Sequence, residues 1–470
     1  MTVLQDKQKP LKTPSNFSLN KAIMEKLSRY FSPPSTVKGM KILDREALRT
    51  TITLPALRIG AKKCSLFLKR LNKCLLNQPR MRNIVPDVSE TSRKILLLHP
   101  MNSLKTLGEE DREFAQNQGA EETTYDLVLG YEHWTSEQVL RAILPDEIDE
   151  IPSSFETIGH IAHLNLRDSQ LEFKSLIGQV ILDKNSPQIK TIVNKTNTIH
   201  DTFRFFKMEV LAGESNFYTS VKQDGCIFEF DFSKVYWNSR LQTEHRRLVE
   251  SFDSGDVVCD MFAGVGPFAI PAAKKGCIIY ANDLNPASYE ALLKNAKINH
   301  VKDKIHAFNL DGRDFVRKMV QLSSSSSLLE SSITDQSIQG SYSRPFTHVV
   351  MNLPASAVEF LDVFHGLYTS HKQLVLPMIH CYCFSKSQSP GDDAKQQVEK
   401  NLGISLKSEY SVHCVRDVAP KKAMVCVSFK LPESVAFADI KRRGVELKRE
   451  REDHNHDGQR TKEAKLDINC

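Results

Sequence analysis

Residues 257–286 constrain the fold most, because two short apolar runs there are joined by a glycine turn and each ends beside an acid. Asp260 closes the first run, Asp283 follows the second, and Gly264 and Gly266 lie in the turn. Strand, glycine turn, helix, strand and acid is the order of a nucleotide-binding βαβ unit. Glycines let the backbone approach a ligand, and the second acid can bind a ribose diol. The chain is therefore predicted to bind the adenosine half of a ligand in an α/β domain.

The glycine turn alone does not identify the ligand, since with Ala269 it also satisfies the dinucleotide fingerprint. A pyrophosphate needs free N–H groups at a helix N-terminus, however, and Pro267 removes one of them. A later apolar strand, 348–351, ends in Asn-Leu-Pro-Ala at 352–355, which resembles the catalytic motif of amino-methylating S-adenosylmethionine enzymes. S-adenosylmethionine is therefore favoured over a dinucleotide and over an α/β domain without a ligand.

Two further positions resemble the same enzymes. The turn is similar to their Asp-x-Phe-x-Gly-x-Gly variant, with Phe262 where many members have glycine. A third acid, Asp311, follows the apolar patch Ile305–Phe308. In such enzymes an acid at this place lies near the adenine amino group, so the resemblance implies the same position for Asp311.

The length of 470 residues favours two or three domains, and 40% hydrophobic residues suffice for their cores. No apolar run approaches the roughly 18–20 residues of a membrane span, and no secretory h-region opens the chain. The ten cysteines form no Cys-x-x-Cys pair, and Cys381 and Cys383 are too close in sequence for ordinary zinc spacing. We expect reduced thiols in an intracellular protein, no metal site, no membrane association and a monomer.

The net charge of +6 hides an asymmetry along the chain. Residues 1–82 carry 18 Lys or Arg and four acids, a balance of +14, so the remainder carries −8. A concentrated basic N-terminus suits a polyanionic partner, although a solvated or mitochondrial targeting segment would also be basic. Lys441–Arg443 is a candidate nuclear-import patch. Cytoplasm and nucleus are therefore expected, with the mitochondrial matrix as a further location.

Breaks in composition and periodicity divide the chain into five segments. Cys64–Leu76 is predicted as a basic amphipathic helix, and Ser136–Leu144 as a helix that ends before Pro145. The predicted segments are 1–35, disordered or targeting; 36–125, a basic N-terminal domain; 126–235, a middle α+β domain; 236–435, the ligand-binding domain with a Ser-rich insertion at 323–343; and 436–470, a charged disordered tail.

Several stretches together resemble one family, the eukaryotic and archaeal tRNA (guanine-37 N1)-methyltransferases. The matching stretches, in the family's order, are Phe155–Leu166, Arg204–Glu214, Val235–Glu244, Asp260–Phe268 and Asn352–Ala355. The stretches before Asp260 matter most, because a generic methyltransferase would lack them. The resemblance covers roughly residues 40 to 430 and excludes the serine-rich insertion and the tail.

The resemblance implies a class I, Rossmann-like methyltransferase domain with a seven-stranded, mostly parallel sheet. A small α+β domain and a basic N-terminal domain would precede it. It also implies methyl transfer from S-adenosylmethionine to N1 of the guanosine 3′ of the anticodon. The tRNA would be held at its outer corner and its anticodon stem-loop. Basic candidates for phosphate contacts are Lys62, Lys63, Lys69, Arg70, Lys73, Arg416, Lys421 and Lys422.

Guanine N1 carries a proton at neutral pH, so the reaction needs a base near N1 and a cation or donor near O6. By resemblance, Glu244 is the base, Arg204 stabilises the charge on O6, and Asn352 orients the guanine edge. The flipped base needs walls, for which Tyr236 and Pro354 are candidates. The implied cofactor-binding residues are His245, Phe262, Gly264, Asp283, Leu284, Asp311, Gly312 and Asn352.

Three other classes remain open at this stage. Aminocarboxypropyl transferases of wybutosine synthesis share the fold, although they need no base at N1, so Glu244 and Asn352–Ala355 favour methyl transfer. An RNA-binding protein with a degenerate domain is disfavoured by the intact acids at Asp260 and Asp283. A protein or DNA amino-methyltransferase would lack the segment from Arg204 to Glu244.

Overall fold

The computed structural model describes residues 30–152, 154–195, 207–324, 344–370, 375–407 and 409–439, with side chains to 322 in the third range. The chain divides into two compact units, which are described separately. The first unit comprises residues up to Thr157, Ile161–Lys195 and Glu209–Ser215, and the second comprises Ile158–His160, Thr196–Met208 and residues from Asn216. Arg204, most of the N-terminal segment, most of the Ser-rich insertion and the tail lie outside the described residues.

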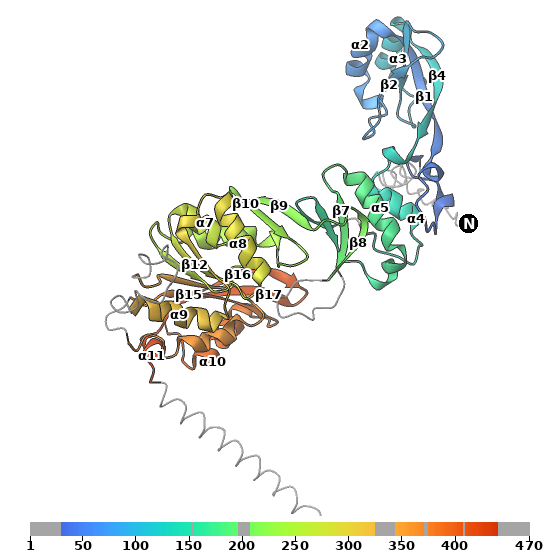
Figure 1. Ribbon diagram of the computed structural model, residues 1–470. Helices are drawn as coiled ribbons and strands as arrows, with labels where there is room; N and C mark the ends of the chain where they lie inside the picture. The colour runs from blue at the N-terminus through green and yellow to red at the C-terminus, as the bar shows by residue number, and fades with distance from the viewer. Residues whose placement is uncertain are drawn as a thin grey trace, which may run out of the picture. The chain divides into compact units, whose positions relative to one another are not determined.

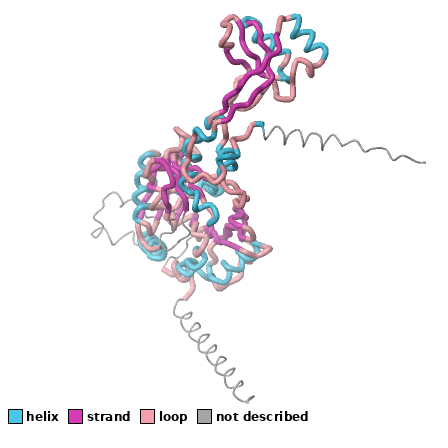
Figure 2. Tube along the Cα trace, turned by 90° about the vertical axis from the view of Figure 1, so that its right-hand side faces the viewer, coloured by secondary structure: helices cyan, strands magenta, loops and turns pink. Residues whose placement is uncertain are grey.

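The first unit begins with an antiparallel four-stranded sheet in the order β2-β3-β1-β4. Strands are drawn in magenta in Figure 2. Helix α2 ends at Arg70 and not at Leu76, because the chain turns into a short 3-10 helix, η4, at Asn72–Cys74. Phe67 of α2 is fully buried. The elements are β1 (Thr50–Gly60), α2 (Cys64–Arg70), β2 (Ile84–Pro86), β3 (Arg93–Leu97), α3 (Glu109–Asn117) and β4 (Glu121–Leu129).

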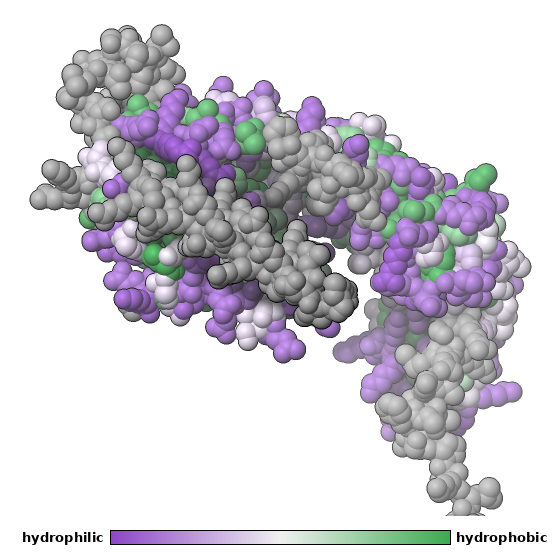
Figure 3. Space-filling view, turned by 90° about the horizontal axis from the view of Figure 1, so that it is seen from below, coloured by the Kyte–Doolittle hydropathy of each residue, from purple (hydrophilic) through white to green (hydrophobic). Residues whose placement is uncertain are grey.

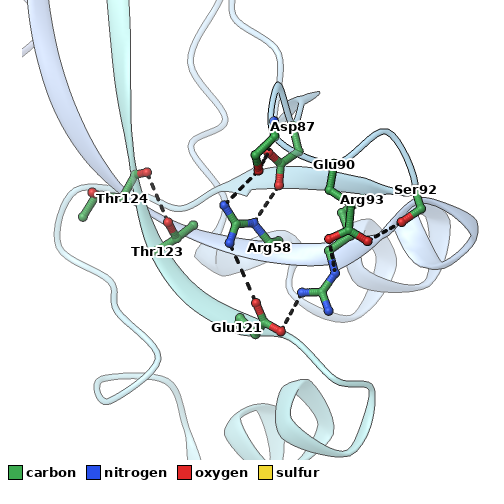
Figure 4. A network of polar contacts seen from close by, with 9 residues as sticks. Arg58, Asp87, Glu90, Ser92, Arg93, Glu121, Thr123 and Thr124 are labelled. Carbon is green, nitrogen blue, oxygen red and sulfur yellow. Dashed lines mark hydrogen bonds and ion pairs between the residues drawn. The ribbon is translucent and has the colours of Figure 1, made fainter.

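Acidic side chains neutralise the arginines of this sheet (Figure 4). Arg58 of β1 donates to Asp87, with Nε to Oδ2 at 2.6 Å. Glu121 of β4 lies between the two arginines, with Oε2 at 3.9 Å from Arg58 and Oε1 at 2.6 Å from Arg93. Arg93 also pairs with Glu90 at 3.2 Å. These two cations are therefore committed to internal ion pairs.

The remainder of the first unit is mixed α and β. Helix α4 (Ser136–Ile143) begins with a capping box, in which Thr135 accepts from the Gln138 backbone and Gln138 accepts in return. Trp134 is buried and donates to the Leu48 carbonyl at 3.0 Å. The other elements are β5 (Glu156–Ile158), β6 (Ile161–Leu164), α5 (Lys174–Asn185), β7 (Thr191–Lys195) and β8 (Met208–Gly213), with sheet order β5-β6-β7-β8.

The second unit opens with a hairpin of β9 (Tyr218–Gln223) and β10 (Cys226–Asp231). Side chains of α8 (Pro286–Ile298) and of the residue after it hold the hairpin backbone. Asn295 Oδ1 accepts from the Glu229 N–H at 2.8 Å, and Asn299 Oδ1 accepts from the Ile227 N–H at 2.9 Å. The hairpin thus packs with the ligand-binding domain, whereas the sequence placed the domain boundary after it, at 235/236.

A seven-stranded sheet forms the centre of the second unit in the order β13-β12-β11-β14-β15-β17-β16. Strands β11 to β15 pair in parallel, and β17 pairs antiparallel with both β15 and β16. The strands are β11 (Val257–Asp260), β12 (Ile278–Asn282), β13 (Ile305–Phe308), β14 (His348–Met351), β15 (Met378–Ser385), β16 (Tyr410–Ala419) and β17 (Lys422–Lys430). The predicted seven-stranded, mostly parallel sheet is confirmed.

Helices cover both faces of this sheet (Figure 1). On one face, α9 and α10 pack with the 3-10 helix η9 over a large apolar core that includes Cys381, Val425 and Phe429. Helices α7 and α8 lie on the other side of the sheet. Besides α8, the helices are α6 (Gln242–Glu250), α7 (Ala269–Lys275), α9 (Gly312–Ser324), η9 (Ala357–Phe364), α10 (Pro390–Leu402) and α11 (Glu433–Ala436).

No helix among the described residues is long and apolar enough to cross a membrane. On the face in Figure 3, the described residues are mostly hydrophilic, with small apolar patches between them.

Candidate active site

The strand order places the site at the carboxyl ends of β11 and β14. From β11 the chain proceeds outward through β12 to β13, whereas β14 lies on the opposite side of β11. Ligands of open α/β sheets bind in the crevice outside such a reversal point. The residues that end or follow these strands are therefore candidates for ligand binding: Asp260, Asp283 and Asn352.

The glycine turn after β11 has two distinct roles. Gly264 has φ +55°, and a Cβ built there would meet no atom of the described residues within 4 Å, so this backbone is open to a ligand. Gly266 has φ +97°, and a Cβ there would lie 2.8 Å from both Ile270 and Leu292. L-residues rarely adopt such positive φ values. The first glycine thus provides close approach, and the second provides the tight packing of the turn against its helices.

The two acids predicted at the strand ends lie in different surroundings. Asp283 Oδ2 accepts from the Gly264 N–H at 2.8 Å, and its Oδ1 accepts from the Asn285 N–H at 2.9 Å. Each oxygen retains acceptor capacity, which suits the two hydroxyls of a ribose. Asp260 is 1% exposed, and within the described residues neither of its carboxylate oxygens has a hydrogen-bond partner of ordinary geometry. Burial, and then the nearby charge of Asp283, raise the pKa of Asp260 to about 8.

A buried asparagine, Asn282, connects the loops around the site. Its side-chain Nδ2 donates to the Leu310 carbonyl at 3.0 Å and to the Met261 carbonyl at 3.3 Å. Its Oδ1 accepts from the Leu310 N–H at 3.0 Å. Sequence reasoning missed this residue, although an asparagine at the last position of a buried strand, directly before an acid, was the available signal.

The adenine side of the predicted site is built from neighbouring loops. Leu284 is 46% exposed and available to cover a base. Asp311 Oδ1 accepts from the Arg313 N–H at 2.9 Å at the start of α9. A Cβ on Gly312 would lie 3.1 Å from the Phe262 ring, so any larger residue would need that ring to shift by a few tenths of an ångström. The five predicted residues Phe262, Asp283, Leu284, Asp311 and Gly312 therefore belong to one set of contiguous loops.

These features fit an adenosine-containing cofactor with a cationic methionine end. Asp283 can bind the ribose, and the open surface at Gly264 admits the ligand to the backbone. The unpartnered carboxyl of Asp260 offers an acceptor at the same edge of the sheet. S-adenosylmethionine contains the ribose that Asp283 can bind and a cationic end that an acceptor such as Asp260 can face.

Glu244 is not an exposed helix charge, because it is 5% exposed in the first turn of α6. Arg247, one turn later, donates Nε to Oε2 and Nη2 to Oε1, each at 2.7 Å. Tyr382 Oη donates to Oε1 at 2.7 Å, and His413 Nε2 lies 3.2 Å from Oε2. A carboxylate has about four acceptor sites; three of them accept hydrogen bonds here, and His413 lies beside Oε2.

Tyr382 and His413, two of the partners of Glu244, belong to a row of residues across three strands. His413 of β16 pairs with Cys426 of β17, which pairs with Tyr382 of β15. Directly opposite residues of adjacent strands share one face of a sheet. The sheet therefore presents His413, Cys426 and Tyr382 side by side to Glu244 of α6. Sequence reasoning missed the row because strand pairing, and not spacing along the chain, brings its members together.

His245, the next residue on α6, is also buried, with 4% exposure. Its Nδ1 lies 3.0 Å from Gln223 Nε2, and its ring meets the edge of Phe268 at 4.7 Å between centroids. Burial lowers the pKa of His245 to about 4, so the imidazole is neutral at physiological pH. Its predicted contact with the cofactor would therefore be a hydrogen bond and not an ion pair.

The remaining predicted residues lie at the end of β14 and before α6. Asn352 follows β14, and its buried Oδ1 has no hydrogen-bond partner among the described residues. Pro354 is half-buried, and its carbonyl accepts from Phe384 of β15 at 3.0 Å. Tyr236 is 47% exposed. Arg204, the expected O6 partner, lies outside the described residues.

The described part of the chain contains no group of three or more His, Cys, Asp or Glu side chains that could hold a metal ion.

The seven-stranded sheet and its strand-end acids define a class of protein, the class I S-adenosylmethionine-dependent methyltransferases.

Comparisons with known proteins give the same class and a narrower family. The TRM5/TYW2 methyltransferase domain matches residues 219–324, and the TYW2 N-terminal domain matches 136–216. Three curated tRNA (guanine(37)-N(1))-methyltransferases are similar over most of their length. They are from Danio rerio (47% identical; 87% of this chain, 85% of the relative), Batrachochytrium dendrobatidis (45%; 88%, 94%) and Homo sapiens (44%; 88%, 80%). The chain belongs to the tRNA (guanine(37)-N(1))-methyltransferase family.

Two solved structures share the fold at lower identity. Trm5b from Pyrococcus abyssi aligns with a TM-score of 0.53 and 22% identity, over 80% of this chain and 99% of that one. A complex of aTrm5 with tRNALeu aligns with a TM-score of 0.57 and 24% identity, over the same shares of the two chains. These two structural similarities show that the chain shares the fold of those proteins.

Proposed function

We propose that this protein transfers the methyl group of S-adenosylmethionine to N1 of the guanosine at position 37 of tRNA. Family membership at 44–47% identity over most of the chain supports the reaction. The observation that carries the chemistry is a buried carboxylate, Glu244, held on the same unit as the strand-end ligand site. When bound, the cofactor supplies an electrophilic methyl group.

Glu244 acts as the general base in this proposal. Guanine N1 must lose its proton as it gains the methyl group, and a carboxylate within hydrogen-bond reach can take that proton. Two bonds from Arg247 and one from Tyr382 hold the Glu244 carboxylate in one orientation. Such fixed orientation keeps the acceptor oxygen where the proton leaves N1.

Asn352 orients the guanine in the same site. Its buried Oδ1 has no partner within the described protein, so a guanine N–H would satisfy an acceptor that otherwise stays unpaired. The loop that follows is tied to β15 through Pro354 and Phe384, two residues beyond Tyr382. Asn352, which orients the guanine edge, therefore follows β14, and Tyr382, which holds the general base Glu244, lies on the neighbouring strand β15 of the same sheet. Arg204 is proposed to stabilise negative charge on O6.

The cofactor is proposed to lie along the strand-end loops. Asp283 binds the ribose hydroxyls, Asp311 and Gly312 meet the adenine edge, and Leu284 covers the ring. The backbone at Gly264 and the side chains of Phe262 and His245 complete the pocket.

Transfer RNA is proposed to contact the first unit through exposed lysines. A relative solved with tRNALeu supports tRNA as the substrate. Arg70 is paired with Glu110 and Asp111, at 3.1 and 2.7 Å, so it is a weak candidate for phosphate contact. Lys62, Lys69 and Lys73 are exposed and are the better candidates.

The protein is further proposed to act as a monomer in cytoplasm and nucleus, and also in the mitochondrial matrix. The basic, acid-poor N-terminus and the Lys441–Arg443 patch support these locations. Fractionation of cells that express the full chain with a C-terminal tag would test them, and sedimentation would test the monomer.

Methyl transfer to unmodified tRNA transcripts tests the proposed reaction. Transcripts with G37 or A37 would be incubated with labelled S-adenosylmethionine and wild type, Glu244→Ala or, as a control on the same helix, the exposed Glu250→Ala. Label on the G37 transcript alone, lost in Glu244→Ala and kept in Glu250→Ala, is expected. Label kept in Glu244→Ala would remove Glu244 as the base.

The same assay addresses the second candidate, aminocarboxypropyl transfer, which the match to the TYW2 N-terminal domain favours. Mass spectrometry of the digested tRNA distinguishes the two modified nucleosides. An aminocarboxypropyl adduct in place of N1-methylguanosine would overturn the proposed reaction.

A further inference from the structure

Glu244 is enclosed by protein, so the proton that it takes from guanine N1 needs a route out of the enzyme. The Glu244 side chain is 4% exposed, so its oxygens have almost no direct contact with water. Every turnover deposits one proton there. A second turnover therefore requires a neighbouring group that can accept the proton and release it to solvent.

Most groups around Glu244 cannot carry this proton. The hydrogen bond to Glu244 raises the pKa of Arg247 above its usual value, so the guanidinium has no vacancy for a further proton. Burial raises the pKa of Tyr382 well above its usual value and that of Cys426 to about 11. Both therefore already hold their protons. His245 is buried and bonded to Gln223.

His413 is the exception among these neighbours. Its side chain is 45% exposed, and its Nε2 lies 3.2 Å from Glu244 Oε2. An imidazole has two ring nitrogens, so it can accept a proton through one and release a proton through the other. The contact of His413 with Glu244 is also the longest of the four contacts to that carboxylate, because the other three are 2.7 Å long.

We propose that His413 moves away from Glu244 Oε2 when the guanine N1–H binds there. After the transfer, His413 carries the proton from Glu244 to solvent. The inference rests on the proposed function of Glu244 and assigns the residue that resets the base. Because it acts through Glu244 and not on the substrate, His413 is a positioning residue.

In the methyl transfer, each bond that breaks is matched by a bond that forms. The N1–H bond breaks, its proton forms a bond with Oε2, and the electron pair left on N1 forms the N1–CH₃ bond. The methyl–sulfur bond breaks and leaves its pair on sulfur. The methylated N1 no longer has a proton to donate, so His413 can return to Oε2. While it is displaced, the neutral imidazole exchanges protons with water and reaches the tautomer that carries its proton on Nδ1. Its Nε2 then takes the proton from Oε2, and water takes the Nδ1 proton from the imidazolium.

Two substitutions separate proton transfer from support of the carboxylate. His413→Gln keeps a hydrogen-bond donor near Oε2 but cannot carry a proton, and His413→Ala removes both. Cys414→Ser, the next residue of β16 and exposed, is the matched control. Methyl transfer to the G37 transcript would be measured in single turnover with excess enzyme and in steady state, from pH 6 to pH 9.

The expected result is a difference between the two regimes. Single turnover deposits one proton and needs no exit, so His413→Gln should stay within about two-fold of wild type. Its steady-state rate should fall about ten-fold or more, in the range that proton-transfer groups contribute. Free imidazole should restore steady-state turnover in His413→Ala, more strongly as pH rises and the imidazole becomes neutral. Cys414→Ser should match wild type in both regimes.

Equal steady-state rates and pH profiles for His413→Gln and wild type would overturn the inference, as would a failure of imidazole to rescue His413→Ala. A loss of single-turnover rate equal to the steady-state loss would also overturn it, because it would indicate a role in support alone. These outcomes differ from failure of the proposed function, in which wild type itself transfers no methyl group or Glu244→Ala keeps full activity.

Discussion

Arg247 holds the carboxylate of Glu244 through two parallel hydrogen bonds of 2.7 Å, from a position one turn later on α6. The Glu244 side chain is 4% exposed and that of Arg247 is 36% exposed. The arginine thus compensates a buried negative charge while its own edge reaches the surface. Bidentate pairs of this kind fix the plane of the carboxylate as well as its charge.

Removing that arginine should destabilise the fold. Arg247→Gln leaves Glu244 buried without its cation, and breaking a buried pair in this way costs about 3–5 kcal/mol. Partial exposure of Arg247 reduces the expected loss in free energy of unfolding to about 2–3 kcal/mol. The adjacent Arg246 pairs with Asp224 and is 54% exposed, so Arg246→Gln should cost less than about 1 kcal/mol. Urea unfolding measures both, and equal losses would contradict the distinction.

Asp283→Asn should weaken cofactor binding without unfolding the protein. The substitution removes a charged acceptor for the ribose hydroxyls and loses one of two backbone bonds. Hydrogen bonds to charged groups contribute about 1.5–3 kcal/mol, which corresponds to a Kd about 10- to 100-fold weaker. Titration calorimetry with S-adenosylmethionine gives the Kd. Asp303→Asn, at an exposed acid after α8, should bind as wild type does, and unchanged affinity in Asp283→Asn would exclude the ribose contact.

The two glycines of the turn should respond differently to alanine. Gly264→Ala meets no protein atom within 4 Å, so its cost is the strained φ of about 1–2 kcal/mol, and its methyl group obstructs the cofactor. Gly266→Ala meets Ile270 and Leu292 at 2.8 Å, which adds packing strain and brings the loss to about 3 kcal/mol or more. Thermal unfolding and cofactor titration together separate these effects. A Gly264→Ala variant with wild-type affinity would show that the ligand does not approach this backbone.

His380 should make stability depend on pH. It is 5% exposed, between His348 and Ser428, and burial, followed by the charges of His348 and Arg247, lowers its pKa to about 3. The unfolded chain therefore binds more protons between pH 6.5 and 3, and stability falls as pH falls through that window. From pH 7 to pH 5 the loss from this group is about 2 kcal/mol.

His380→Asn lacks that titration, so its free energy of unfolding should approach that of wild type as the pH is lowered from 7 to 5. Denaturant unfolding at both pH values gives the difference. The exposed His300→Asn, on a positive φ that asparagine tolerates, should leave the pH dependence of wild type unchanged. A constant gap between His380→Asn and wild type would contradict the prediction.

Salt dependence should identify the cations that contact tRNA. The triple variant Lys62→Ala, Lys69→Ala, Lys73→Ala should lower the slope of log K against log salt by about 2–3, near one unit per lost phosphate contact. Arg70→Ala should change the slope little, because Glu110 and Asp111 already neutralise that arginine. Filter binding of tRNA at several salt concentrations measures both. A larger change in Arg70→Ala than in the triple variant would reverse the assignment.

Local patterns in the sequence predicted the βαβ unit and the class of sheet because they are properties of consecutive residues. Acids directly after Val257–Cys259 and near Ile278–Asn282 had to appear at strand ends, and positive φ is natural for Gly264 and Gly266. The end of α2 at Arg70 was not predicted, because helix ends depend on packing that periodicity does not record.

The amino-acid sequence by itself determined the family, the strand-end acids and the identity of Glu244 as a candidate base. Only the tertiary structure decided what surrounds that base. Tyr382, Cys426 and His413 lie on three strands, and antiparallel register across β15, β17 and β16 brings them to one face. Burial of Glu244 at that face, and the single half-exposed neighbour among its partners, follow from how α6 packs on the sheet, which no spacing along the chain encodes.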